Sequence, residues 1–397
     1  MRNFTFKGLF LTAVFMLLGC LTIQAADDYL ITKQITIKLE EAGTLPNKIA
    51  SSEMYKITNL KITGEINGTD WKMIREMAGS NYKGEPTEGK LSVLDLSEAR
   101  IVEGGDCYYY DDRGYTYTSN DKIGYCAFAY CSGLTSLNLP AGITTIGFNA
   151  FYGCSGLTSL TLPADITSID YGTFYGCSGL TSINLPSSVT KIGSWAFTDC
   201  NGLTSLNLPD GITEIGSYAF RDCSGLTSLT LPAGITEIGM SAFEGCSGLT
   251  SLNLPSSVTE IGMLAFKGCS GLTSLTIPAG ITSIAGYAFN GCSGLTSIYV
   301  YAEKVPEIGS HVFEECDAKK CTVYVPKGTY GDYRSSNFGY FENIVEFDAT
   351  GIDKTTTSTD VEEVSRYSVN GQRLVGPTKG LNIVKYSDGS VKKVTVE

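Results

Sequence analysis

The stretch Cys131-Ser-Gly-Leu-Thr-Ser-Leu-Asn-Leu-Pro-Ala-Gly-Ile-Thr-Thr-Ile-Gly-Phe-Asn-Ala-Phe-Tyr-Gly153 recurs, almost unchanged, every 23 residues through the middle of the chain. Eight cysteines mark the period: Cys131, Cys154, Cys177, Cys200, Cys223, Cys246, Cys269 and Cys292. A period in the twenties with apolar residues spaced L-x-x-L-x-L is typical of a solenoid, in which each unit buries its apolar side only against its neighbours. The sequence therefore predicts a leucine-rich repeat solenoid.

One repeat also predicts the course of one coil. The leucines of Leu134–Leu139 alternate with polar residues at the end of the run, as in a short strand with one buried face. Pro140 ends that strand because it lacks the amide that a continuing ladder needs. Ile143 and Ile146 point inward on the return path, and Ala150–Phe151 closes the core. We expect a parallel sheet on one face and short turns or 3-10 segments on the other.

The cysteine period has two alternatives to simple burial, a metal site and disulfides. Paired spacings such as C-x-x-C, which metal sites use, do not occur in the sequence. Stacked coils hold equivalent Cβ atoms about 4.8 Å apart, whereas a disulfide needs about 3.8 Å. We therefore expect eight small buried side chains, no metal and no cofactor. Cys107 and Cys126 lie outside the ladder, and a disulfide between them stays an open alternative in an exported protein.

The chain of 397 residues has a net charge of -12, and this balance argues against nucleic acid as a partner. Residues 1–25 combine basic residues, an apolar run and a small-residue end at Ala25, as a secretory signal peptide does. No segment is apolar for the ~20 residues of a membrane-spanning helix. Leu17-Leu18-Gly19-Cys20 resembles the lipobox of bacterial lipoproteins, so a lipid anchor at Cys20 is the alternative to cleavage near Ala25 or Ala26.

The flanks of the array differ from the repeats. Residues 26–106 contain divergent repeats and a helix-like segment, which we interpret as the cap of an open solenoid end. Residues 107–347 hold the array and a second, aromatic cap, and they begin within a tyrosine-rich loop at Gly104–Asp121. Residues 348–360 are rich in Thr and Ser and are expected to be a linker. Residues 361–397 predict three short strands with turns at Asn370-Gly371 and Asp388-Gly389.

Leu-Thr-Ser-Leu-x-Leu-Pro, Ile-Thr-x-Ile-Gly-x-x-Ala-Phe and the cysteine period resemble the BspA-type leucine-rich repeat proteins, roughly over 107–347. That resemblance implies a surface or secreted protein of anaerobic Gram-negative bacteria, and adhesion to host matrix proteins or other bacteria. The final segment is similar to the C-terminal sorting domain of the type IX secretion route, through Val369-Asn-Gly-Gln-Arg373 and Gly380-Leu-Asn-Ile-Val-Lys385, although it is shorter.

Catalytic chemistry has little support in the sequence. The single histidine, His311, lies beside the last coil, and no nucleophile and base accompany it in a recognisable pattern. Phosphate-binding glycine loops and paired histidines are also missing from the sequence. We therefore expect a protein without enzymatic activity.

Binding has more support, and three groups of residues are candidates. The outer turns vary and carry Phe148, Tyr171, Trp195 and Tyr218, for which partial burial between coils is the alternative. The strands expose uncharged polar residues, among them Asn184 and Asn207. The alternative for these residues is that they only face solvent and bind nothing. The inserted loop adds Tyr108, Tyr109 and Tyr110. We expect an exported adhesin, at the outer membrane or outside the cell, that binds a host or bacterial surface protein or glycan. The alternative is an envelope scaffold without a specific ligand.

Overall fold

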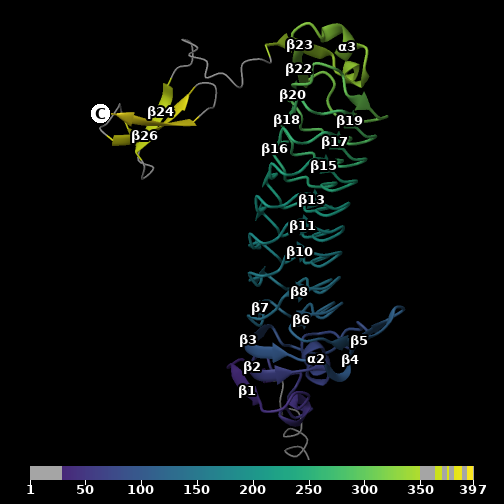
Figure 1. Cartoon of the computed structure of the whole chain (residues 1–397), viewed down its shortest axis with the longest axis vertical. Coiled ribbons are helices and arrows are strands. Elements are labelled where there is room, and N and C mark those ends of the chain that lie inside the picture. Colours follow the sequence, from purple (N-terminus) through teal and green to yellow (C-terminus); the bar gives the residue numbers. More distant parts are fainter. Residues whose placement is uncertain (1–28, 349–362, 369–372, 375–379, 387–390, 397) are drawn as a thin grey trace, which may run out of the picture. The chain divides into compact units, whose positions relative to one another are not determined.

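The computed structural model describes residues 29–348, 363–368, 373–374, 380–386 and 391–396. The chain forms two compact units that divide between Phe347 and Asp348. The first unit contains the repeats, whose coils stack in one column (Figure 1). The expected signal peptide 1–25, its Cys20 and residues 349–360 of the expected linker lie outside the described residues.

Most coils contribute one short strand to a parallel sheet, which we call the strand face; the coil that begins at Cys177 contributes only isolated bridges at Asn184, so the sheet has two sections. Pairing shifts by one repeat per coil, as between Ser136 and Ser159 or Ser205 and Ser228, and this register confirms the predicted solenoid. The first section of the sheet contains β1 (Ile35–Leu39), β2 (Asn59–Ile66), β3 (Val93–Ile101), β7 (Ser136–Asn138) and β9 (Ser159–Leu160). The second contains β12 (Ser205–Asn207), β14 (Ser228–Thr230), β16 (Ser251–Asn253), β18 (Ser274–Ile277), β20 (Ser297–Val300), β22 (Thr322–Pro326) and β23 (Asn343–Phe347).

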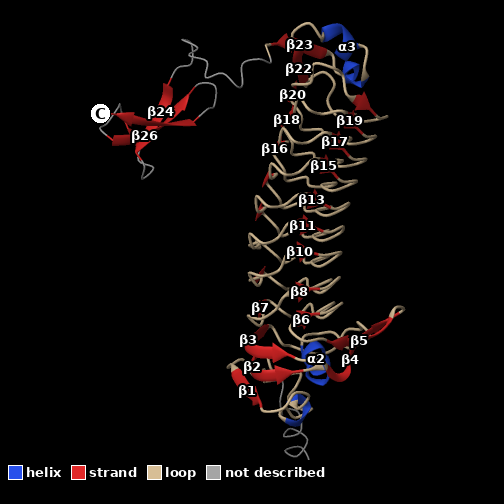
Figure 2. Cartoon of the chain, in the orientation of Figure 1, coloured by secondary structure: helices blue, strands red, loops and turns tan. Residues whose placement is uncertain are grey.

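The return path of each coil forms further parallel strands of two residues, which the sequence analysis did not predict. They pair in three groups: β6 (Lys122–Ile123) and β8 (Thr145–Ile146); β10 (Ser168–Ile169), β11 (Lys191–Ile192) and β13 (Glu214–Ile215); β15 (Glu237–Ile238), β17 (Glu260–Ile261), β19 (Ser283–Ile284) and β21 (Glu307–Ile308). The remaining side of each coil is made of turns (Figure 2). The expected 3-10 segments occur, within the described residues, only in the caps, at η1 (Leu45–Asn47) and η2 (Asn337–Tyr340).

The core is a set of columns of identical side chains. Phenylalanine rings from Phe128 to Phe289 stack between successive coils with centroids 5.2 to 5.5 Å apart. All eight repeat cysteines are buried in one file. From Cys154 onward, each thiol donates to the phenylalanine carbonyl of the preceding coil, as Cys200 does to Phe174 at 3.1 Å. The cysteine is therefore a buried donor as well as a small apolar side chain.

The N-terminal cap is built on α2 (Gly68–Met77), close to the helix-like segment that the sequence indicates. Asn67 and Asp70 close a capping box at its start, and Asp70 also accepts from the amides of Gly43 and Leu45. Trp71 and Arg75 are fully buried against the first coil. The helix thereby covers the open end of the phenylalanine column, with Trp71 5.0 Å from Phe128.

Cap side chains replace the hydrogen-bond donors of a missing coil. In later coils the turn carbonyls accept from the preceding coil, as Ala150 accepts from the amide of Phe128. The equivalent carbonyls of the first coil, one repeat earlier, have no such coil before them. They accept instead from the Tyr108 hydroxyl (at Tyr125), from Trp71 Nε1 and Arg75 Nη1 (at Ala127), and from Arg75 Nη2 (at Ala129), at 2.8 to 2.9 Å.

The C-terminal cap consists of α3 (Tyr330–Arg334), η2 and β23. Tyr333, Phe338 and Phe341 are buried, and both phenylalanines pack on Phe313 of the last coil. These rings lie over the last phenylalanine of the column, where the sequence analysis expected an aromatic cap. The second unit is a sheet in the order β25 (Arg373–Leu374), β24 (Glu363–Ser368), β26 (Gly380–Tyr386), β27 (Val391–Val396), with antiparallel pairing. It has four strands where the sequence indicated three.

Candidate binding surfaces

The turn side of the column, which we call the turn face, is shaped by residues with left-handed backbone. Two positions per coil have positive φ, as at Trp195 (63°) and Asp199 (59°). Residues other than glycine rarely adopt this backbone conformation. Between them, Ala196 and Phe197 point into the core and are fully buried. The turn therefore directs its two flanking side chains outward while it fills the core.

Five aromatic residues of successive coils form a continuous row on the turn face. The aromatic row consists of Tyr130, Tyr152, Tyr175, Trp195 and Tyr218. Successive ring centroids are 5.2, 4.7, 6.1 and 4.2 Å apart. Trp195 and Tyr218 are nearly parallel, at 13°, so each covers one face of the other.

This stacking decides what the row presents to a partner. Both Trp195 and Tyr218 are only partly exposed, so the alternative of partial burial between coils applies to them. Phe148 and Tyr171, on the same face, are 50% and 44% exposed, and their rings meet edge to face at 6.4 Å. Phe148 and Tyr171 are therefore the most exposed aromatic side chains of the turn face.

The tyrosine-rich loop is a hairpin of β4 (Gly104–Asp111) and β5 (Gly114–Thr118). The expectation that Tyr108 and Tyr109 contact a partner is wrong, because both are buried in the cap at 1% and 7% exposure. Tyr110, in contrast, is exposed, and its ring lies 4.7 Å from that of Tyr115. The exposed tyrosines of the hairpin are Tyr110, Tyr115 and Tyr117.

Contacts at the tip of the hairpin, where Asp111 and Arg113 flank the turn, join it to the turn face. Tyr125 occupies the position one repeat before Phe148, and its hydroxyl donates to a carboxylate oxygen of Asp111. Arg113 lies over the Tyr125 ring, 5.3 Å from its centroid. Burial and the hydrogen bond to Asp111 raise the pKa of Tyr125, so the hydroxyl remains a donor. The hairpin tyrosines and the turn-face aromatics therefore belong to adjoining surfaces.

Charged side chains border the far end of the aromatic row. Arg221 pairs with Asp222 at 3.3 Å and with Glu244 at 3.5 Å, and Lys267 reaches Glu244 at 3.7 Å. Burial raises the pKa of Asp222, with Arg221 opposing the shift. These pairs form a polar rim beside an aromatic surface, which is the usual layout of a protein interface.

The strand face carries the other predicted candidates. Asn184 and Asn207 are exposed and lie next to each other in register, with Thr161 before them and Thr230 after them. The return path carries glutamates in one file, and Glu214 pairs with Lys191 at 2.8 Å. Within the described residues, no group of three or more His, Cys, Asp or Glu side chains is arranged to hold a metal ion.

The proposed disulfide between Cys107 and Cys126 is not formed in the structure, where both are free thiols. The Cys107 thiol donates to the Tyr109 carbonyl at 2.9 Å, while Cys126 is buried at the start of the first coil.

His311 is half exposed, stacks on Tyr287 and lies 3.2 Å from Glu314.

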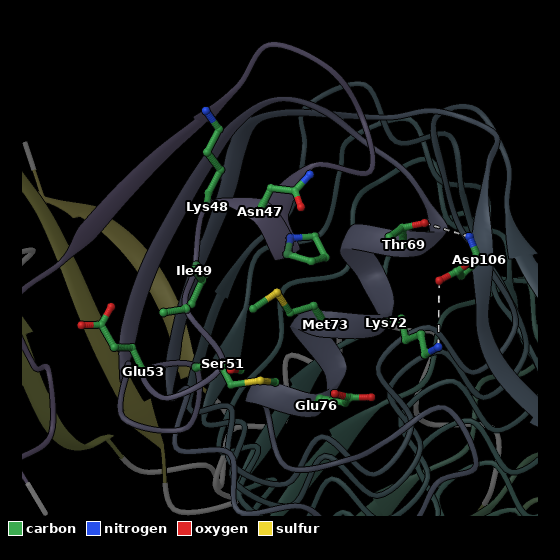
Figure 3. Close-up of a pocket in the computed structure, with 13 residues that line it drawn as sticks. Asn47, Lys48, Ile49, Ser51, Glu53, Thr69, Lys72, Met73, Glu76 and Asp106 are labelled. Atoms are coloured by element: carbon green, nitrogen blue, oxygen red, sulfur yellow. Dashed lines mark hydrogen bonds and ion pairs between the residues drawn. The ribbon is translucent and has the colours of Figure 1, made fainter.

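A cleft of about 670 Å³ in the N-terminal cap was not anticipated from the sequence. It lies between the segment Pro46–Met54 and one side of α2 (Figure 3). Ile49 and Met73 point into it, whereas Lys48 and Glu53 point away from the helix. Across the cleft Lys72 approaches Asp106 at 3.9 Å. No repeat or motif marks these residues, because segments distant in sequence form the cleft.

The fold is that of a leucine-rich repeat protein, and the candidate binding residues lie on the outside of its stacked coils. The family model "BspA type Leucine rich repeat region (6 copies)" matches residues 116–227 and 213–333, which together span more than half of the chain. The chain belongs to the BspA-type leucine-rich repeat family, as the sequence resemblance predicted. A search of curated proteins found no match.

Solved structures with similar folds come from several bacteria. The leucine-rich repeat protein TpLRR of T. pallidum is 31% identical, and the match covers 45% of this chain and 72% of that one, with a TM-score of 0.36. A leucine-rich repeat protein of Bacteroides ovatus is 21% identical, with coverages of 79% and 92% and a TM-score of 0.34. A leucine-rich cell surface protein of Faecalibacterium prausnitzii is 22% identical, with coverages of 67% and 87% and a TM-score of 0.36. Among the described residues of this chain, no helix has the length and hydropathy needed to cross a membrane.

Proposed function

We propose that this chain is an exported surface protein that binds a protein partner through its turn face, as an adhesin for a host matrix protein. One observation carries the proposal: exposed aromatic rings at Phe148 and Tyr171 adjoin the aromatic row and the hairpin tyrosines. Tyrosine and tryptophan supply large contact area with few rotatable bonds, and they dominate the energetics of protein interfaces.

The stacked geometry favours a protein over a sugar at this face. A sugar binds an aromatic ring through the flat face of the ring, whereas Trp195 and Tyr218 cover each other's faces and leave mainly edges outward. Ring edges are apolar and weakly positive, so they suit the aliphatic side chains and carbonyl oxygens of a protein surface. Arg221, Asp222 and Glu244 supply the charged rim.

The position outside the cell is part of the proposal. Residues 1–25 would direct export, with either cleavage near Ala25 or a lipid anchor at Cys20. The small sheet within residues 361–397 would serve secretion or attachment, as its similarity to a type IX sorting domain implies. The protein would act by binding alone, without a cofactor and without catalysis.

Binding of the full mature chain to a panel of immobilised matrix proteins, measured by biolayer interferometry, tests the proposal. The double variant Phe148→Ala/Tyr171→Ala should weaken the saturable partner by about 10- to 100-fold, as loss of interface hot spots does. Tyr330→Ala is the matched control, because this ring is 47% exposed on the opposite cap. If no matrix protein binds saturably, the chain is an envelope scaffold. Equal affinity of the double variant would move the site away from the turn face.

A further inference from the structure

We propose that the strand face is a second binding surface, for a linear, uncharged polysaccharide that lies along the column with about one sugar per coil. This inference concerns a different face and a different class of partner, so it is independent of the protein-binding proposal. It rests on the regular arrangement of side chains on the strands.

Two files of small polar side chains form the surface, which we call the strand-face grid. The first file contains Asn138, Thr161, Asn184, Asn207, Thr230, Asn253 and Thr276; the second contains Ser136, Ser159, Ser182, Ser205, Ser228, Ser251 and Ser274. Strand pairing places neighbours of the first file side by side from Thr161 to Thr276. Parallel strands lie about 4.8 Å apart, and alternate residues of one strand about 6.7 Å apart.

The grid is unoccupied by internal hydrogen bonds. Within the described part of the chain, none of these fourteen side chains has a hydrogen-bond or ion-pair partner. The threonine that precedes each serine behaves differently, since its hydroxyl donates to the preceding coil, as Thr204 does to Thr181 and Thr227 to Thr204. The same strands thus satisfy one hydroxyl internally and direct the other polar groups outward.

The chemistry of the grid selects the class of ligand. Asparagine, serine and threonine each donate and accept hydrogen bonds, and the grid contains no charge and no large apolar anchor. Protein partners need aromatic or arginine anchors, which the grid lacks. An added peptide strand needs an open sheet edge, whereas these backbones are paired on both sides. A chain of sugars offers hydroxyls that donate and accept at every step, with a repeat close to the spacing of the coils.

Both ends of the grid are marked by different side chains. At the N-terminal end the file continues to Asp95, which pairs with Lys61 at 3.5 Å. At the other end Thr276 lies next to Tyr299, whose ring stacks on Tyr324 at 4.6 Å. An extended uncharged ligand would therefore occupy the seven coils between a charged end and an aromatic end.

Titration calorimetry of the full mature chain with neutral β-linked gluco-oligosaccharides of two to eight sugars tests the inference. Affinity should rise several-fold with each added sugar and level off near seven, because each coil adds one set of hydrogen bonds. The variant Asn184→Ala/Asn207→Ala/Asn253→Ala should lower affinity at least 10-fold without loss of stability, since all three side chains are exposed. Phe148→Ala/Tyr171→Ala should leave glycan affinity unchanged.

Three outcomes would overturn the inference. They are the absence of binding by any neutral oligosaccharide, unchanged affinity in the triple asparagine variant, and binding that requires a charged polysaccharide such as heparin. Because the turn-face variant serves as the control, failure here is separate from failure of protein binding. Matrix-protein binding by the triple asparagine variant would remain intact in that case.

Discussion

Replacement of Arg75 by methionine tests how the open end of the solenoid is closed. Methionine keeps much of the side-chain volume and removes the guanidinium, which is fully buried. Arg75 donates to the carbonyls of Asn81, Cys126, Ala127 and Ala129 and to the Ser80 hydroxyl. The substitution therefore removes every donor that this side chain gives to the first coil.

The size of the stability loss depends on which carbonyls keep another hydrogen-bond donor. Ala127 keeps Trp71 Nε1, Cys126 keeps the amide of Ala129, and Asn81 keeps the amide of Gly84. Only the Ala129 carbonyl loses its sole donor within the described residues. A buried acceptor that loses its sole donor costs about 1–3 kcal/mol, and the weaker hydrogen bonding of the other three carbonyls adds to this loss. Relief of the buried charge offsets part of this loss. We expect Arg75→Met to lower the free energy of unfolding by about 2–4 kcal/mol.

The loss should be local, because each coil of a solenoid contacts only its neighbours. Urea unfolding should show an early transition, and hydrogen exchange should accelerate in residues 68–131 while coils beyond Cys200 keep their protection. Arg100→Met is the control, since this arginine is 60% exposed in its ion pairs. A change below about 0.5 kcal/mol, or faster exchange spread evenly over all coils, would refute the capping role.

Four further predictions concern the coils. Burial raises the pKa of the ladder thiols, to about 11 for Cys131, so an alkylating reagent at pH 8.5 should label Cys107 far faster than the ladder. The thiols ionise more readily in the unfolded chain, where their pKa is near 8.5, than in the folded one. The stability that they contribute is therefore fully present below pH 8.5 and decreases above it. Thermal melts from pH 7 to 10.5 should show a steeper decrease than in a Cys200→Val variant. Trp195→Gly should be about 1 kcal/mol more stable than Trp195→Ala, because glycine accepts a φ of 63° and alanine does not; equal melting temperatures would contradict this. Deletion of one coil, Cys246–Gly268, should shorten the glycan plateau by one sugar and leave protein binding unchanged, as the two titrations would show.

The columns of the core could be predicted from the sequence because a fixed period turns each repeated residue into a file. The period and the apolar pattern alone predict that Cys200 and Phe197 are buried. The caps could not be derived in this way. Trp71 and Arg75 act by donating to carbonyls that lack a preceding coil, and this demand exists only once the coils are stacked. Their sequence shows an amphipathic helix and nothing of its partners.

The aromatic row was predicted in part, for a geometric reason. Of the row, Trp195 and Tyr218 occupy the two turn positions before the Ala-Phe pair, and comparison of equivalent positions finds them. Tyr152 and Tyr175 follow that pair instead, yet the left-handed turn brings Tyr175 within 6.1 Å of Trp195. Tyr108, in contrast, was expected on the surface and is buried. The inserted segment is a hairpin whose first strand packs inward on Trp71. Where the repeat is interrupted, position in sequence no longer gives position in space.

The two faces of the column also differ in how much they vary from coil to coil, and this difference matches the two proposed classes of partner. Serine and Asn or Thr recur along the strand face over seven coils, so the face offers the same contacts at each step. A ligand that is itself periodic gains from every step, and its affinity grows with its length. Turn positions change from Phe148 to Tyr171 to Ser194, which creates one surface that no other part of the column repeats. Such a surface suits a folded partner with one matching site, because specificity then depends on contacts that occur once.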